Sequence, residues 1–206
     1  MDPTTESLLA AVDGELSCDD DEMPVLQKRN ATLEDYTATG EGVPALLLDG
    51  DLWLLDPPTP AHQQAAAEIG AQLRPAARRV DALGWVILPE INLRLGPHMF
   101  GPDLAGWRRS RMPQRPDSSH IEVVPDWVCE ILSPSTSRFD KGRKREIYAT
   151  AGVETLWFVD PRNHSVDILT LTGAEYRVTT YAEQNEKVAL PPFIDIELDL
   201  SLFWAH

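Results

Sequence analysis

The sequence has 206 residues, of which 43% are hydrophobic and 25% are charged, a balance typical of a globular domain with its own core. This composition excludes collagen, disordered polymers and coiled coils. No segment approaches the ~20 uninterrupted apolar residues that cross a bilayer, and the N-terminus lacks the basic start and apolar run of a signal peptide. We therefore expect a cytoplasmic protein without a membrane segment.

The net charge of −15 is unevenly distributed along the chain. Residues 1–22 contain eight acidic residues and no basic one, so they supply −8 of that total. Concentrated like charge repels itself and leaves little apolar surface to bury, so residues 1–29 are predicted to be a flexible acidic leader before a single domain at 30–206. The basic residues cluster at 108–115 and 138–145, and the local field matters more for binding an anion than the net charge does.

The first half of the domain is predicted to alternate between helices and strands. In chain order we expect a short helix from Thr32, a β-hairpin over 44–58, a helix over 61–83, and strands at 84–90, 91–95 and 102–107. The hairpin is predicted to turn at Asp49-Gly50. Pro75 is expected to kink the helix or to end it near residue 74.

The second half begins with a polar loop at 108–120. After it we expect a buried strand at 125–132, a helix over 138–152, a buried strand at 154–161, an antiparallel hairpin around Thr172-Gly173, and a last edge element at 193–204. Gly152 is predicted to end the helix as its C-terminal glycine. The fold class that this succession indicates is α/β (α+β), with a mixed β-sheet flanked by helices.

Two acidic residues fall in predicted strands that are otherwise apolar. Asp103 belongs to the strand at 102–107, and Glu130 belongs to the strand at 125–132. A buried ionised carboxylate is costly unless it is paired or binds a cation. If the two strands share a sheet and have adjacent ends, both carboxylates can bind one Mg²⁺, with the backbone carbonyl of Ile131 as a third oxygen ligand. Because Mg²⁺ keeps several waters that can act as nucleophiles, the pair predicts hydrolysis of phosphodiester bonds.

Lys144 is the candidate for a cationic group beside this metal site. Asp140, Lys144 and Tyr148 are spaced four residues apart in the predicted helix, so they share one face. On that face Lys144 would stabilise the charge of the phosphate under attack or position the water. The alternative is that Lys144 forms a solvated ion pair with Asp140 on the helix surface.

Three motifs follow one another along the chain. They are Pro-Asp at 102–103, PDWVCEILSPST at 125–136, and D-x-x-x-K-x-x-x-Y at 140–148, which is followed by LWFVDP. This order resembles the Uma-type restriction endonucleases, a family of the PD-(D/E)xK nuclease superfamily, over roughly residues 30–205. The resemblance implies a restriction-endonuclease-like core in which Asp103 and Glu130 bind Mg²⁺ or Mn²⁺ and cleave DNA.

One position departs from the superfamily pattern. The lysine that follows the second acid by two residues would be at 132, where this sequence has Leu132. The resemblance implies that a lysine on the next helix takes this role, and Lys144 fits that position. We therefore expect Asp103, Glu130 and Lys144 to be the catalytic residues.

Four further residues are weaker candidates for the site. Glu90 would add a metal or water contact, or it is a solvent-exposed residue at a strand edge. Glu68 would support the site from its helix, or it is the polar position of an amphipathic helix. His62 resembles a histidine often found at this point in the family, and its alternative role is to enter the helix with a hydrogen bond to backbone. Tyr148 shares a helix face with Lys144.

Basic residues that lie between and after the two acidic strands are the predicted contacts to a nucleic-acid backbone. They are Arg108, Arg109, Arg111 and Lys141. The three arginines lie in the segment 108–120, where a flexible basic loop between the acidic strands can hold phosphates. The alternative is that this segment is a solvated insertion.

The sequence thus predicts a Mg²⁺-dependent endonuclease that cuts DNA, with RNA as the other substrate that remains open. A homodimer is expected, because enzymes that cut both strands often pair two active sites by two-fold symmetry. The alternative is a catalytically inactive nuclease-like module that binds nucleic acid or a protein partner, which the net charge and Leu132 favour. No phosphate-binding loop G-x-x-x-x-G-K-[ST] or dinucleotide motif G-x-G-x-x-G occurs, so no nucleotide cofactor is expected.

Overall fold

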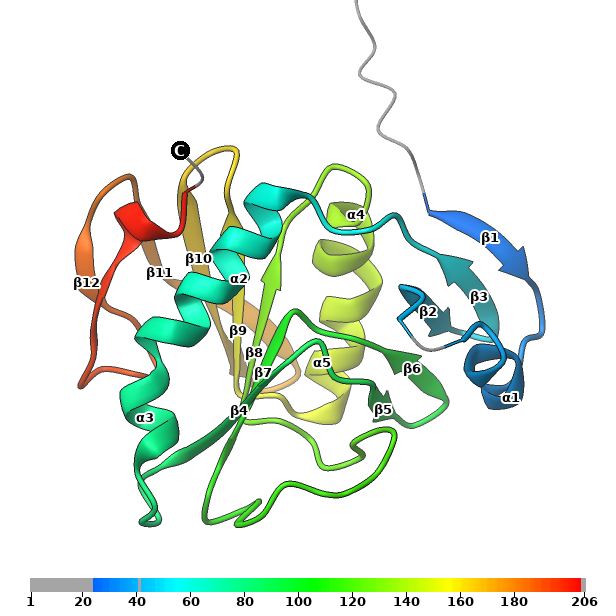
Figure 1. Ribbon diagram of the computed structural model, residues 1–206, viewed down its shortest axis with the longest axis horizontal. Coiled ribbons are helices and arrows are strands. Elements are labelled where there is room, and N and C mark those ends of the chain that lie inside the picture. Colours follow the sequence, from blue (N-terminus) through cyan, green and yellow to red (C-terminus); the bar gives the residue numbers. More distant parts are fainter. Residues whose placement is uncertain (1–23, 41, 205–206) are drawn as a thin grey trace, which may run out of the picture.

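The computed structural model describes residues 24–40 and 42–204, and its largest element is a six-stranded sheet with the strand order β11-β10-β9-β8-β7-β4 (Figure 1). These strands are β4 (Trp85–Pro89), β7 (Leu104–Arg108), β8 (Trp127–Ile131), β9 (Thr155–Asp160), β10 (Ser165–Thr172) and β11 (Glu175–Glu183). β8 and β9 run parallel, and the other neighbouring pairs are antiparallel. The mixed sheet predicted from the sequence is confirmed.

A second, five-stranded sheet is built mainly from the N-terminal part of the chain. Its order is β1-β3-β2-β6-β5, with β1 (Val25–Lys28), β2 (Ala45–Leu48), β3 (Asp51–Leu54), β5 (Leu93–Leu95) and β6 (His98–Phe100). β2 and β3 form the predicted hairpin, and both turn residues, Asp49 and Gly50, have positive φ. Residues 25–28, which the sequence analysis assigned to the acidic leader, instead form an edge strand paired with β3. Residues 1–23 of that leader lie outside the described residues.

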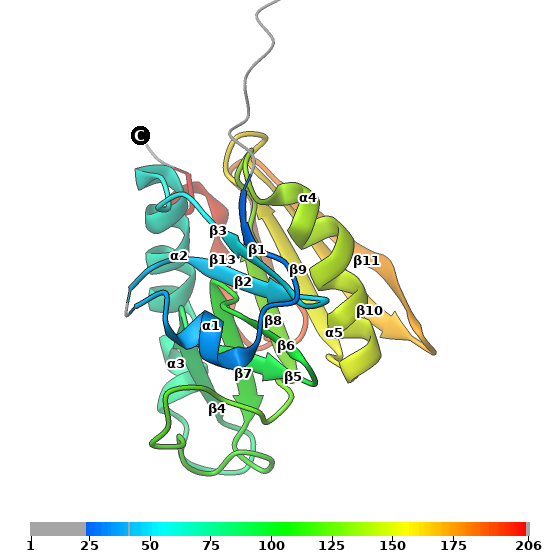
Figure 2. The same cartoon turned by 90° about the vertical axis from the view of Figure 1, so that its right-hand side faces the viewer.

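Helices cover both faces of the six-stranded sheet (Figure 2). One face packs against α2 (Pro60–Gln72) and α3 (Arg74–Arg78), which meet at Leu73, next to the predicted break at Pro75. The other face packs against a continuous helical segment of α4 (Ser137–Phe139), the π-helical η1 (Asp140–Lys144) and α5 (Arg145–Ala151). Gly152 ends this segment in the left-handed conformation, as predicted, at φ 86°. No helix in the described ranges is both long and apolar enough to cross a membrane.

Strand alternation determines which helix each residue of β8 faces. Because successive side chains point to opposite faces of a strand, Trp127 and Ile131 join the apolar cluster with α2, whereas Val128 joins the cluster with α5. Glu130 lies on the same side as Val128. The strand therefore directs one buried carboxylate toward the helical segment that carries Lys144.

The remaining elements are short. They are α1 (Leu33–Thr37), β12 (Lys187–Ala189), β13 (Glu197–Asp199) and the 3₁₀-helix η2 (Leu200–Leu202). Thr32 caps α1 as predicted, and its side chain accepts a hydrogen bond from the Asp35 amide. β12 and β13 pair with each other in a separate two-stranded sheet, so the predicted last edge element belongs to that sheet.

Two predicted elements have wrong ends. The helix expected over 61–83 stops at Arg78, so Val80 and Leu83, which were predicted on its apolar face, are 89% and 71% exposed. The strand expected at 102–107 begins at Leu104, so Asp103 precedes it rather than lying within it. Both errors come from apolar or helical spacing that continues past the point where the backbone changes direction.

Candidate active site

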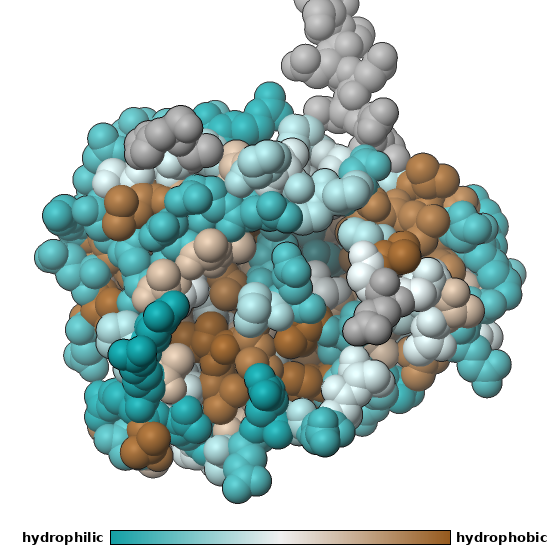
Figure 3. Space-filling view, in the orientation of Figure 1, coloured by the Kyte–Doolittle hydropathy of each residue, from teal (hydrophilic) through white to brown (hydrophobic). Residues whose placement is uncertain are grey.

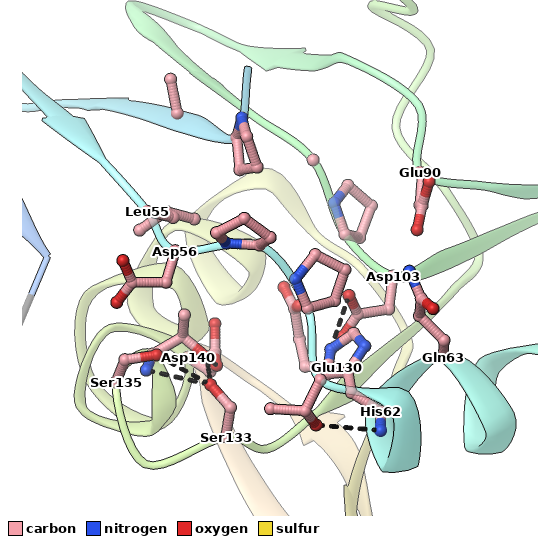
Figure 4. A pocket seen from close by; sticks show the side chains of 18 of the residues that line it. Leu55, Asp56, His62, Gln63, Glu90, Asp103, Glu130, Ser133, Ser135 and Asp140 are labelled. Carbon is pink, nitrogen blue, oxygen red and sulfur yellow. Dashed lines mark hydrogen bonds and ion pairs between the residues drawn. The ribbon is translucent and has the colours of Figure 1, made fainter. Parts of the chain in front are cut away.

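A cavity of about 930 Å³ lies between the two larger sheets and brings together the sequence-predicted acids. Its walls come from the start of α2, the residue before β7, the end of β8 with the turn after it, η1, and two segments that flank the β2–β3 hairpin. Figure 3 shows the surface hollowed between α2 and the N-terminal sheet. In Figure 4 the side chains of His62, Asp103, Glu130 and Asp140 border this space from different elements.

Glu130 lies at the base of the cavity and is 1% exposed. Lys144 Nζ donates to both of its carboxylate oxygens, at 3.0 and 3.1 Å, and the Tyr148 hydroxyl donates to Oε1 at 2.5 Å. Burial raises the pKa of Glu130 to about 8, although the positive charge of Lys144 acts in the opposite direction. The carboxylate is therefore held by two donors in a place where water solvates it little.

Lys144 is bound by a second carboxylate. Its Nζ lies 2.8 Å from Oδ1 of Asp140, and the hydroxyl of Thr136 donates to Oδ2 of Asp140 at 2.8 Å. Burial alone lowers the pKa of Lys144, but the neighbouring carboxylates, above all that of Asp140, raise it above its usual value. Lys144 thus stays an ammonium ion, and the alternative of a solvated pair with Asp140 is wrong, because both side chains are at most 5% exposed.

Asp103 is held by two groups from different elements. Its Oδ2 accepts a hydrogen bond of 2.6 Å from the backbone amide of Ile131, and its Oδ1 lies 3.1 Å from Nε2 of His62. Burial lowers the pKa of His62, but the hydrogen bond to Asp103 and the negative charge of that residue outweigh it and raise the value. The backbone amide of His62 donates to the hydroxyl of Thr59, which caps α2, so His62 lies at the start of that helix and its ring contacts Asp103 rather than a backbone group.

The charges in this cluster favour a divalent cation. Three carboxylates, those of Asp103, Glu130 and Asp140, face one permanent cation, Lys144. Mg²⁺ needs only one or two carboxylates because it keeps several waters. Within the described ranges no three His, Cys, Asp or Glu side chains form a group that could hold a metal ion. Carboxylate oxygens such as those of Asp103 and Glu130 are the donors that Mg²⁺ prefers, and metal binding by these two residues and by the Ile131 carbonyl stays a prediction. The backbone amide of Ile131 binds Asp103.

Of the two weaker acidic candidates, one lines the cavity and the other does not. Glu90 lines the cavity from the end of β4 and adopts a left-handed φ of 45°, and its negative charge contributes to the raised pKa of His62. Glu68 does not line the cavity, and its carboxylate accepts a hydrogen bond from Gln64 one turn earlier on α2. Its polar position on an amphipathic helix, the alternative considered from the sequence, is what the structure shows.

The predicted arginine contacts lie far from this cavity. Arg108 ends β7, five residues after Asp103, which places it about 16 Å away along an extended strand. Arg108 and Arg111 form ion pairs with the buried Asp126, and Arg109 donates to two carbonyls at the end of α3. These arginines therefore fasten the loop at the opposite end of the sheet. Lys141 is exposed and directly follows Asp140.

The sequence indicated that the segment from Ser133 to Ser137 shapes the loop beside the site, but it did not predict that Asp140 takes part in the site. Asp140 was recognised only as a helical neighbour of Lys144, although its spacing of four residues already placed the two side chains together. Ser133 Oγ bonds the Thr136 hydroxyl at 2.9 Å, so the SPST turn positions the group that holds Asp140. The walls contributed by the β2–β3 hairpin gave no signal, because only the tertiary fold brings them to the site.

Comparison with known proteins finds a matching family and solved structures of similar fold. A model of the family Uma2, described as "Putative restriction endonuclease", matches residues 31–202. Among solved structures, a protein of Anabaena variabilis ATCC 29413 described as a putative nuclease belonging to DUF820 superposes with a TM-score of 0.68 and 20% sequence identity. The match covers 84% of this chain and 97% of that chain, and at this identity it shows a shared fold. No curated protein matches the chain.

Proposed function

The chain belongs to the Uma2 family of restriction-endonuclease-like proteins, and on this premise we propose that it hydrolyses phosphodiester bonds of DNA with the aid of Mg²⁺ or Mn²⁺. One observation carries the proposal. Asp103 and the buried Glu130–Lys144–Asp140 cluster border the same cavity, although they come from three separate parts of the chain. A buried cluster of this kind is costly to maintain, and perturbed ionisable groups gathered in a cleft are typical of active sites.

Each residue has a role in this proposal. Asp103 and Glu130 would hold the ion, which when bound supplies charge neutralisation at the phosphate and a water of lowered pKa. Lys144 presents a fixed positive charge for the negative charge that develops on the phosphate. Asp140 and Tyr148 act as positioning residues, because they hold the Lys144 ammonium and the Glu130 carboxylate in place.

His62 is a third positioning residue. Its Nε2 contacts one oxygen of Asp103 while the Ile131 amide binds the other, so the carboxylate is fixed from both sides. A carboxylate that is already oriented loses less conformational entropy when it binds a cation. The pair therefore prepares Asp103 for a metal without supplying a further ligand.

Metal dependence tests the proposal. Purified protein incubated with supercoiled plasmid and with single-stranded DNA is expected to cut in Mg²⁺ or Mn²⁺ and to leave both intact in EDTA, because in this proposal the bound ion lowers the pKa of the attacking water and neutralises charge at the phosphate. Re-addition of Mn²⁺ after chelation is the control that the protein has stayed folded. Cleavage that persists in EDTA would contradict the proposal. The absence of cleavage in both Mg²⁺ and Mn²⁺ would also contradict it and would favour a non-catalytic binding module.

A further inference from the structure

We infer that the substrate of this site is an unpaired polynucleotide strand rather than an intact duplex. The inference rests on the proposed nuclease function and narrows its substrate class. Three features of the described residues lead to it: the buried position of Glu130 and Lys144 at the base of the cavity, the charge of the cavity wall, and the place of the unpaired basic side chains beside it. The acidic wall includes the two proposed metal ligands, Asp103 and Glu130, whereas the other two features do not depend on the metal.

Two of the reacting groups lie buried at the base of the cavity. Glu130 and Lys144 are 1% and 4% exposed, so a phosphate reaches them only by entering the 930 Å³ space. That volume is at the upper end of sites for small ligands, about 300 to 1,000 Å³. Five prolines from different wall segments line it, and proline fixes its own φ near −65°. These residues are Pro44, Pro57, Pro58, Pro102 and Pro134. A volume of this size holds a few unpaired nucleotides but not a whole double helix.

The cavity wall is strongly acidic. Five carboxylates line it, those of Asp56, Glu90, Asp103, Glu130 and Asp140, against the single ammonium of Lys144. Duplex DNA carries one negative charge per about 1.7 Å of its axis, and a single strand about half that density. Repulsion from this wall therefore disfavours a duplex more than an unpaired strand, of which only a short stretch has to enter with its counter-ions.

Free basic side chains occur next to the cavity at one place. Arg138 and Lys141 are exposed on the helical segment whose residues Thr136 and Asp140 line the wall. Neither forms an ion pair with any part of the chain that the structure describes. Two phosphate contacts suit a strand that crosses the helix as it leaves the cavity, and they are few for a protein that holds a duplex.

The direct experiment compares oligonucleotides of one sequence in Mn²⁺: single-stranded DNA, blunt duplex, duplex with a 3′ single-stranded overhang, and single-stranded RNA. Single-stranded DNA or RNA is expected to be cut at least about tenfold faster than the blunt duplex, and the overhang to be cut within its unpaired part. A duplex cut as fast as the single strand would overturn this inference and leave the nuclease proposal standing.

The two proposals fail in different ways. If no substrate is cut, the nuclease proposal fails, and fluorescence anisotropy with the same labelled oligonucleotides still decides the strand preference. Tighter binding of the single strand then supports the inference. Equal or tighter binding of the duplex, or binding of neither, overturns it.

Charge reversal tests whether the strand that leaves the cavity contacts Arg138 and Lys141. The variant Arg138→Glu/Lys141→Glu is expected to raise KM for the single strand about tenfold and to leave kcat unchanged, because neither residue contacts the reacting groups. The matched control is Arg115→Glu/Arg177→Glu, which reverses two exposed charges at the other end of the sheet, in the loop after β7 and on β11 opposite Thr170. An equal effect of both double variants, or no effect of the first, would overturn the proposed path.

Discussion

Replacement of Lys144 by methionine is expected to lower the free energy of unfolding by about 3 to 5 kcal/mol and to abolish cleavage. The ammonium of Lys144 is the single cation within ion-pair distance of Glu130 and Asp140 in the described part of the chain, and both carboxylates are 2% exposed. Removing one partner from a buried ion pair leaves an uncompensated charge, which costs this much because burial prevents solvation. Chemical denaturation followed by circular dichroism measures the change.

The control for this variant is Lys187→Met. Lys187 also forms an ion pair, with Asp199 at 3.2 Å, but its side chain is 63% exposed. Exposed pairs contribute little, since solvent screens them, so the control is expected to unfold almost as the wild type does. If the free energy of unfolding of Lys144→Met equals that of Lys187→Met, the buried cluster does not contribute to stability as a unit. The proposed role of Lys144 as a fixed positive charge is then contradicted.

Asp103→Asn is expected to reduce cleavage by about 10³-fold or more and to leave the fold intact. The asparagine oxygen can still accept the hydrogen bond from the Ile131 amide, and its amide nitrogen can face His62, so the local contacts have substitutes. The loss of a charged oxygen removes one of the two carboxylates proposed to hold the cation, and groups that act as a unit show losses of this size.

The measurement is the single-turnover rate in Mn²⁺, with denaturation curves for both proteins as the check of folding. The matched control is Glu68→Gln, which neutralises an acid of α2 that does not line the cavity. Its rate should equal that of the wild type. A rate for Asp103→Asn within a few fold of the wild type would remove Asp103 from the proposed metal site.

Local sequence signals predicted most of the elements correctly. Alternation and apolar runs located β8 and β9, Asp-Gly located the β2–β3 turn, and Gly152 located the end of α5, because each depends on the backbone preferences of a few neighbouring residues. The end of the α2–α3 helical segment was predicted less well. Val80 and Leu83 keep helical spacing, but both side chains are exposed because no apolar surface packs against them. The periodicity of a sequence does not show whether such a packing partner exists.

The sequence predicted those parts of the site that depend on neighbouring residues of one helix. It did not predict the parts that depend on how distant segments pack together. The spacing of Asp140, Lys144 and Tyr148 placed them on one side of a helix, and the structure keeps these three together, although the backbone from Asp140 to Lys144 is π-helical. The positions of the arginines could be determined only from the structure. They follow Asp103 closely in sequence, but a strand of five residues carries them to the opposite end of the sheet.

The most direct test of the two-carboxylate site is the cleavage rate of Glu130→Gln beside the wild type, in Mn²⁺ and on the same single-stranded substrate. The variant keeps the size of the side chain and an acceptor for the Tyr148 hydroxyl, but it removes one of the two acceptors of Lys144, so a denaturation curve is measured beside the rate. We expect the wild type to cut and the folded variant to show no cleavage above the EDTA background. A folded Glu130→Gln protein that cuts at the wild-type rate would contradict the account.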